Sequence, residues 1–279
     1  MVSVPRAATG CQCDVVCFAG KIRPSRISLV DRLLEATAHV EHTHFWYRGF
    51  RRFVRPLLAQ ATAGIPQPRL LDCGCGTGAN LRLLQQYGHA IGFDLTRRGL
   101  EFARQHGHRR VAQATVTAVP FKSGCFDVVT SFDVLYCLPD EAETAAIAEM
   151  HRLLKPGGAL IVNVAALEML RGDHSILGGE VRRYTTGRLR TTLERGGFHI
   201  VRATYTNASL FPLVAGVRMW QRLRGLTKNP TSGDFFRPPT IVNAAFSGAL
   251  AAEAMALRWT NMPVGSSVLC LARKGESAG

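Results

Sequence analysis

The residues with the clearest chemical potential lie between positions 72 and 78, where three glycines alternate behind a carboxylate. Asp72, Gly74, Gly76 and Gly78 form the pattern Asp-x-Gly-x-Gly-x-Gly directly after a short apolar run. Glycine adopts the unusual dihedral angles of a tight turn and lets the backbone approach a ligand closely. The pattern therefore predicts a strand, a ligand-binding turn and a helix, which is the start of a nucleotide-binding α/β unit.

A second carboxylate, Asp94, ends the next strand-like run, 89–94. An acid at this distance from a glycine turn accepts hydrogen bonds from two ribose hydroxyls, although a helix-capping role for Asp94 is the alternative. The dinucleotide fingerprint has the spacing G-x-G-x-x-G, which the alternate glycines do not match. This difference disfavours a nicotinamide-dependent oxidoreductase.

These residues need a scaffold, and strand and helix patterns alternate along most of the chain. Such alternation predicts a doubly wound, mostly parallel sheet with helices on both faces. Strand patterns cover 69–71, 89–94, 110–115, 126–131, 159–164, 198–206 and 266–273. One helix pattern follows the glycine turn, a second follows Thr96, and two more cover 140–154 and 186–195. The helix at 140–154 is predicted to begin with a capping box of Asp140 and Glu143.

Three segments lie outside this alternating pattern. Residues 1–27 have no periodicity and are expected to be a disordered tail, so the folded domain is 28–279. Segment 28–66 predicts two helices joined by an aromatic stretch, 41–52, which serves either as core packing or as a flap over a ligand. Segment 207–263 predicts an apolar helical insertion, and Asn243 and Glu253 interrupt its second half too often for a membrane span.

Composition limits the partners. Of 279 residues 47% are hydrophobic, enough for a sizeable core, and the formal net charge is +14. Because the basic residues are scattered, the charge favours an anionic substrate or a membrane surface over nucleic acid. Most of the eight cysteines fall in predicted strands and suit a reducing cytoplasm. The cluster Cys11, Cys13 and Cys17 lacks a fourth ligand, so no metal site is predicted.

Two further blocks complete a recognisable order. Val119-Pro120-Phe121 with Phe126-Asp127-Val128-Val129, and then Leu153 to Gly158 (LLKPGG), follow the glycine turn and Asp94. Together the four blocks resemble class I S-adenosylmethionine-dependent methyltransferases of the type 11 group over about residues 40–205. The resemblance implies a Rossmann-like, seven-stranded sheet with an antiparallel last strand and the helical insertion before it.

The resemblance also implies a reaction and a cofactor site. S-adenosylmethionine would donate its methyl group by in-line displacement to a small-molecule or lipid-linked acceptor, with peripheral membrane contact one option and the oligomeric state open. Thr115 stands where the group usually has an acid for adenine, so a non-catalytic methyltransferase-fold binding or scaffold protein is the alternative. The implied cofactor-binding residues are Asp72, Gly74, Cys75, Gly76, Gly78, Asp94, Leu95, Thr115, Val116, Ser131 and Asp133.

Candidates for a general base follow the same resemblance. His174 and Tyr184 lie in a segment similar to the group's HD…GHxRRYT run, and His44 lies in the aromatic stretch. Ser175 and Glu180 replace the group's usual Asp and His, which weakens a base at the second position. Arg182 and Arg183 are candidates either to hold an anionic acceptor or to solvate the following helix.

Overall fold

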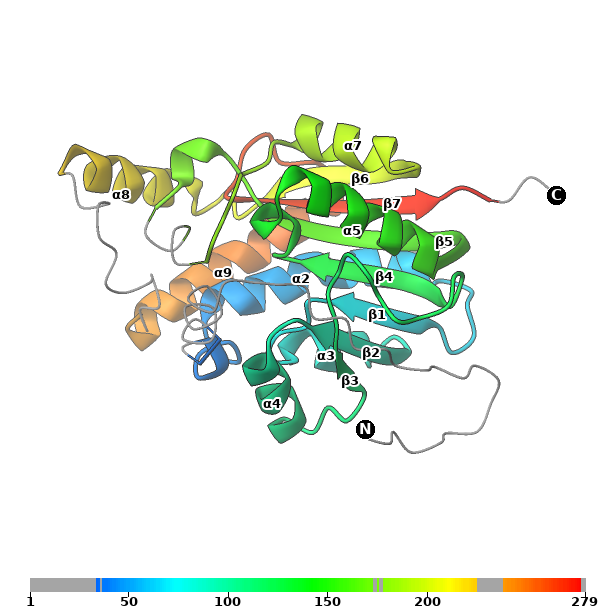
Figure 1. The fold of residues 1–279 in the computed structure, drawn as a ribbon. Helices are drawn as coiled ribbons and strands as arrows, with labels where there is room; N and C mark the ends of the chain where they lie inside the picture. The colour runs from blue at the N-terminus through cyan, green and yellow to red at the C-terminus, as the bar shows by residue number, and fades with distance from the viewer. Residues whose placement is uncertain (1–33, 36, 173–174, 176–177, 225–237, 277–279) are drawn as a thin grey trace.

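One seven-stranded sheet runs through the molecule in the order β3-β2-β1-β4-β5-β7-β6 (Figure 1). The computed structural model describes residues 34–35, 37–172, 175, 178–224 and 238–276. The predicted tail 1–27 lies outside the described residues. The strands are β1 (Arg69–Cys73), β2 (His89–Asp94), β3 (Val111–Gln113), β4 (Phe126–Phe132), β5 (Leu154–Ala165), β6 (Phe198–Thr206) and β7 (Ser267–Lys274).

The pairing confirms the predicted fold class. Strands β1 to β5 are mutually parallel, and β7 inserts antiparallel between β5 and β6. The last strand is therefore antiparallel and follows the helical insertion. Since the carboxyl ends of parallel strands meet at one edge of a sheet, this topology brings the ends of β1, β2 and β4 together.

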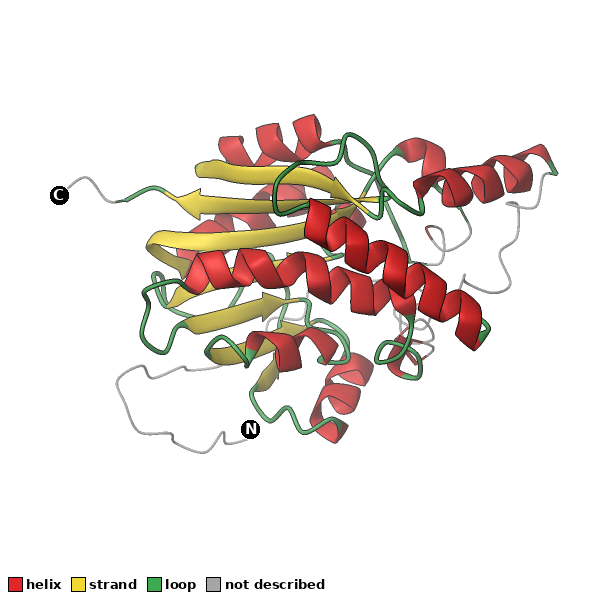
Figure 2. Ribbon diagram, turned by 180° about the vertical axis from the view of Figure 1, so that it is seen from behind, coloured by secondary structure: helices red, strands yellow, loops and turns green. Residues whose placement is uncertain are grey.

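Helices cover both faces of the sheet (Figures 1 and 2). Helices α5 and α7 enclose one apolar core, and α2, α3 and α9 enclose the other. The helices are α2 (Phe45–Thr62), α3 (Ala79–Leu84), α4 (Arg97–Gln105), α5 (Asp140–Leu153), α7 (Thr186–Arg195), α8 (Phe211–Leu223) and α9 (Thr240–Ala256), with 3₁₀ turns η1 (Leu135–Cys137) and η2 (Glu168–Leu170).

The N-terminal helix α2 and the insertion helix α9 lie side by side over the sheet (Figure 2). Gly49 allows this approach, because a Cβ there would lie 2.4 Å from Leu250 Cδ1. Asn243 joins the two helices by accepting from Phe45 N–H at 2.8 Å and donating to the Thr43 carbonyl at 3.1 Å. Glu253 accepts from the amides of Ala208 and Ser209 ahead of α8. The polar residues that interrupt the apolar pattern thus tie α9 into the fold.

Three local predictions differ from the structure. Residues 45–52 are the first turns of α2 rather than part of a connection between helices. Pro139 is the N-cap of α5, and Glu143 is buried in an ion pair with Arg182, so the predicted capping box is wrong. The strand pattern at 159–164 begins earlier, since β5 already includes Lys155 to Gly158. Among the described helices, none is long and apolar enough to cross a membrane.

Candidate cofactor site

The glycine turn after β1 requires glycine for reasons of geometry. Gly74, Gly76 and Gly78 have φ angles of 81°, 49° and 82°, which side-chain-bearing residues rarely adopt. Space is also limiting: a Cβ on Gly74 would lie 2.4 Å from Val134 Cγ2, and one on Gly78 would lie 2.8 Å from His108 Cδ2. The turn therefore holds a shape that only this spacing permits.

The backbone amides of the turn are largely engaged within the protein. Gly74 and Cys75 donate to the Phe93 carbonyl at 2.9 Å, and Gly78 donates to the Cys75 carbonyl. The Cys75 side chain is buried, so its thiol packs in the core rather than lining a cleft. A ligand is able to approach the backbone of the turn closely, and carboxylates lie beside that position.

Asp94 joins the turn to the end of β2. Its Oδ2 accepts from the Gly76 amide at 2.8 Å, while Oδ1 accepts from the amide and hydroxyl of Thr96 at 2.8 and 2.6 Å. Asp94 thus fixes the turn and anchors Thr96, which is itself the N-cap of α4, so Asp94 does not act as the helix cap. A carboxylate has about four acceptor positions and these bonds use three, so about one remains for a ligand hydroxyl.

Asp72 is a buried carboxyl with one oxygen unused. Its Oδ1 accepts from the Thr130 hydroxyl at 2.7 Å, whereas Oδ2 has no hydrogen-bond partner among the described residues. Burial raises the pKa of Asp72 to about 7, and the nearby charge of Asp94 adds to the rise. A buried carboxyl in this state is poised to ionise when a cation arrives.

Glu41, which the sequence did not single out as a site residue, supplies a third carboxyl at the turn. Its Oε2 accepts from the Thr77 hydroxyl at 2.6 Å, and its Oε1 is buried without a hydrogen bond. The nearest cationic candidate, His42 Nε2, lies 3.9 Å away. Burial raises the pKa of Glu41. In the sequence, Glu41 is recognisable only as an acid at the start of the aromatic stretch. That position does not reveal its contact with Thr77, which lies 36 positions further along the chain.

The residues after β3 follow a backbone contact with Asp94. The Ala114 amide donates to the Asp94 carbonyl at 3.1 Å, which places Thr115 and Val116 next to it. Leu95 is 38% exposed, so an apolar surface is available there, and Val116 is buried. The Thr115 hydroxyl pairs with that of Thr117 at 2.9 Å and is only half buried. It therefore offers a ligand a weaker partner than an acid would.

The end of β4 contributes Ser131 and Asp133. Ser131 is fully buried, and its hydroxyl has no partner among the described residues. Asp133 has a φ of 61° and accepts from Asn163 Nδ2 at 2.9 Å. Asp133 is an exposed residue, and the protein packed around its carboxyl raises the pKa of that group to about 7. Asn163, with an unused buried Oδ1, is a second residue that sequence reasoning missed.

Tyr184 is not available as a general base, and this prediction is wrong. Its side chain is fully buried, and its phenol donates to Glu143, which is itself paired with Arg182. Arg182 also pairs with Asp140 at 2.7 Å, so it is committed to structure rather than to an acceptor. The arrangement closes the core between α5 and the segment ahead of α7.

Of the other two candidates for a general base, the structure describes only His44. His174 lies outside the described residues. His44 is the N-cap of α2, where its Nδ1 accepts from the Trp46 amide at 3.2 Å, and its ring stacks on Phe45. A base role for His44 stays a prediction. Arg183 pairs with Glu180 at 2.9 Å and bonds Ser175, so the two departures from the family pattern form a structural contact.

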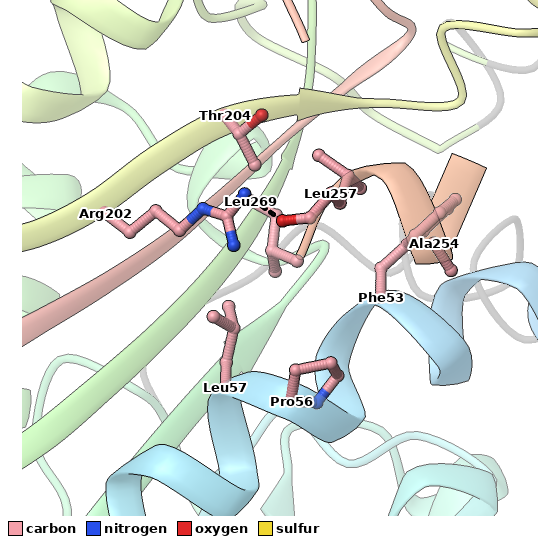
Figure 3. Close-up of a pocket in the computed structure, with 8 residues that line it drawn as sticks. All are labelled: Phe53, Pro56, Leu57, Arg202, Thr204, Ala254, Leu257 and Leu269. Carbon is pink, nitrogen blue, oxygen red and sulfur yellow. Dashed lines mark hydrogen bonds between the residues drawn. The ribbon is translucent and has the colours of Figure 1, made fainter. Parts of the chain in front are cut away.

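A small cavity between α2, α9 and the β6–β7 pair is unrelated to this site (Figure 3). Its volume of about 20 Å³ is room for a single water. Arg202 crosses it and donates to the Leu257 carbonyl (Figure 3). None of the predicted site residues lines it.

The comparisons with known proteins address the same segment. A family described as a methyltransferase domain matches residues 71–162, which contain the glycine turn, Asp94, Ser131 and Asp133. This match supports a class I S-adenosylmethionine-dependent methyltransferase domain over residues 71–162. Their cofactor, S-adenosylmethionine, carries a cationic ammonium and a sulfonium besides its ribose. The unused buried oxygens of Asp72 and Glu41 and the acceptor capacity of Asp94 fit that group.

Similar proteins differ in what they act on. A malonyl-[acyl-carrier protein] O-methyltransferase of Herminiimonas arsenicoxydans is 34% identical over 49% of this chain and 52% of its own length. A probable tRNA methyltransferase 9B of Homo sapiens is 29% identical, over 46% and 30% of the two chains. The chain thus spans about half or less of these relatives.

The fold comparison agrees. The structure of a Burkholderia thailandensis 1,6-didemethyltoxoflavin-N1-methyltransferase, which holds its substrate and S-adenosylhomocysteine, matches with a TM-score of 0.52 at 17% identity. The match covers 94% of each chain. At this identity the likeness speaks for the methyltransferase fold alone.

Proposed function

We propose that the protein transfers a methyl group from S-adenosylmethionine to a small-molecule or lipid-linked acceptor. When bound, the cofactor would supply a sulfonium methyl group, to which the acceptor would bond in line while the methyl–sulfur bond breaks and the thioether leaves. The chain contributes binding, alignment and exclusion of water. The observation that carries the proposal is the convergence of Asp72, Asp94 and Glu41 on the glycine turn, with two of the three holding an unused buried oxygen.

Each site residue receives a role in this proposal. Asp94 accepts from a ribose hydroxyl while keeping the turn closed through Gly76. Glu41 and Asp72 provide negative charge for the ammonium, Glu41 directly and Asp72 from beneath the turn. Leu95 and Val116 flank the adenine, with Thr115 as its polar partner, and Ser131 and Asp133 border the side from which an acceptor enters.

The acceptor side of the proposed site is built around Asp133. Asp133 carries a carboxyl whose pKa burial raises to about 7, so it is able to take a proton from an acceptor near neutral pH. We propose Asp133 as the base if the acceptor must lose a proton, beside His44 and His174. Nucleic acid is not the proposed acceptor, because the basic residues are scattered along the sequence. A reducing cytoplasmic setting is part of the proposal, and the described cysteines form no disulfide.

The test is a methyl-transfer screen with radiolabelled S-adenosylmethionine and a panel of carboxylate, phenol, amine and lipid-linked acceptors. The proposal expects transfer to at least one class, with loss of transfer in Asp133→Asn if that carboxyl is the base. Tight cofactor binding with no transfer to any class favours the binding or scaffold alternative. Binding of a nicotinamide cofactor in place of S-adenosylmethionine contradicts the proposal outright.

A further inference from the structure

Helix α8 carries its apolar side chains outward. Leu213, Val217, Met219, Trp220 and Leu223 are 52%, 45%, 56%, 50% and 82% exposed; these five residues are called the outer face of α8. At about 100° per residue they occupy a continuous arc of about 160° around the helix. A surface helix of a globular protein normally turns such an arc toward the core, so α8 presents the opposite arrangement.

The inner side of α8 explains how the helix is held in this orientation. Val214, Arg218 and Gln221 lie on that side and are half buried, and Arg218 bonds Gln221 at 2.7 Å. The Arg218 guanidinium also lies against Gly172, where a Cβ would come within 2.6 Å of it. Packing against the segment around η2 therefore uses the mixed side of α8 and leaves the apolar side largely exposed.

Helix α8 lies at the same end of the molecule as the residues of the proposed site (Figures 1 and 2). Helix α8 extends from the end of the molecule toward which the arrows of β1 and β4 point, and the N-terminus of α9 reaches the same end (Figures 1 and 2). Ile241, in the first turn of α9, is 84% exposed. Asp72, Asp94 and Asp133 end or follow strands at this edge. An apolar surface and the site thus share one end of the molecule.

The charge around the outer face identifies its occupant. Helix α8 contains no acidic residue, and Arg224 follows it with its guanidinium 4.1 Å from the Trp220 ring centroid. A tryptophan beside an arginine suits the boundary between lipid headgroups and acyl chains. A symmetric contact between two copies would bring like-charged Arg224 groups near each other, which disfavours self-association. The 13 residues of α8 span about 20 Å, too short for the roughly 30 Å hydrocarbon core, so the helix suits the interface.

We propose that the outer face of α8 docks on an anionic lipid surface, which presents a lipid-anchored acceptor to the site. The identity of the acceptor rests on the proposed function, whereas docking itself is testable without it. Docking would orient the strand ends toward the membrane. The acceptor class is then an amphipathic molecule whose polar group reaches Asp133 while its apolar part stays in the lipid.

The test is flotation of the full chain with phosphatidylcholine vesicles, with and without phosphatidylglycerol, in low and high salt. Wild-type protein floats with the anionic vesicles, and high salt weakens the association. The double variant Trp220→Ser/Leu223→Ser loses roughly a hundredfold in partitioning, because two large apolar side chains no longer enter the lipid. Arg224→Ala loses about fivefold.

A matched double variant serves as the control. Val201→Ser/Trp259→Ser removes an exposed aliphatic and an exposed tryptophan, 44% and 78% exposed, that lie together near Arg202 and away from α8. It is expected to float like the wild type. Equal flotation of the two double variants, or no flotation of the wild type, overturns the docking proposal. Light scattering that shows a wild-type dimer and a monomeric Trp220→Ser/Leu223→Ser variant also overturns the docking proposal, because a second copy of the chain would then bind the outer face of α8.

Calorimetry on the same preparations separates this proposal from the previous one. Binding of S-adenosylmethionine without flotation refutes docking alone. Flotation without cofactor binding refutes the proposed methyl transfer and leaves docking standing.

Discussion

Replacing Glu41 with Gln is expected to weaken cofactor binding without weakening the fold. The carboxylate Oε1 is buried without a hydrogen bond, and His42 Nε2 lies 3.9 Å from it, so the substitution removes one long ionic contact and no hydrogen bond of Oε1. Burial already raises the pKa of Glu41, which means that the surroundings disfavour its charge. The amide oxygen of Gln is able to keep the bond from the Thr77 hydroxyl. The melting temperature should therefore stay constant or rise.

The loss appears when the cofactor binds. A hydrogen bond to a charged group contributes about 1.5–3 kcal/mol, so the Kd for S-adenosylmethionine should rise about ten- to 150-fold in Glu41→Gln. Isothermal titration calorimetry measures this directly. Glu35→Gln is the matched control, because Glu35 makes a surface pair with Arg98 and its side chain is 46% exposed. Wild-type affinity in Glu41→Gln, with Glu35→Gln also unchanged, would refute the role of Glu41 as the ammonium partner.

Three further predictions follow from the described contacts. Burial holds the folded pKa of Asp72 at about 7, above its unfolded value, so the stability linked to its proton is complete at acid pH and is lost as pH rises through 7. A cationic cofactor favours the ionised carboxylate, so the affinity for S-adenosylmethionine should increase up to about tenfold for each unit that the pH is raised toward 7. Asp72→Asn should flatten this dependence of affinity on pH. Tyr184→Phe removes the bond to buried Glu143 and should lower the unfolding free energy by about 1.5–3 kcal/mol in urea denaturation, with kcat unchanged; a kcat that falls at constant stability would restore a catalytic role. Gly74→Ala should abolish cofactor binding, whereas Gly124→Ala, at a φ of 65° with open space around it, bears backbone strain alone and should bind normally; equal binding by both would contradict the steric account.

The fold could be predicted because its signals are local. Alternate glycines after an apolar run specify a turn, and the runs at 89–94, 186–195 and 198–206 have the bounds that the structure gives them. Such signals depend on periodicity and on residues that permit particular dihedral angles, both of which are readable along the chain. The antiparallel position of β7 came instead from the family resemblance, since periodicity does not give strand direction.

The site was only partly predictable because its missing members depend on contacts distant in sequence. Glu41 acts on Thr77, and Asn163 acts on Asp133, 30 positions away. Glu143 fits a capping pattern, yet it is drawn into the core by Arg182 and Tyr184, 39 and 41 positions on. The same segment contains the family-like run that suggested Tyr184 as a base. The family-like motif therefore predicted which segment lies near the site, whereas the burial of Glu143 and Tyr184 could be seen only in the structure.

The most direct test of the central claim is calorimetric titration of wild-type protein and Asp94→Ala with S-adenosylmethionine, with a nicotinamide dinucleotide as comparator. We expect the wild type to bind S-adenosylmethionine and not the dinucleotide. Asp94→Ala should lose at least tenfold in affinity, because the ribose partner and the bond that fixes Gly76 vanish together. Its circular dichroism spectrum should remain that of the wild type. Undiminished S-adenosylmethionine binding by Asp94→Ala would contradict the site, and absence of binding by the wild type would contradict the proposed methyltransferase activity.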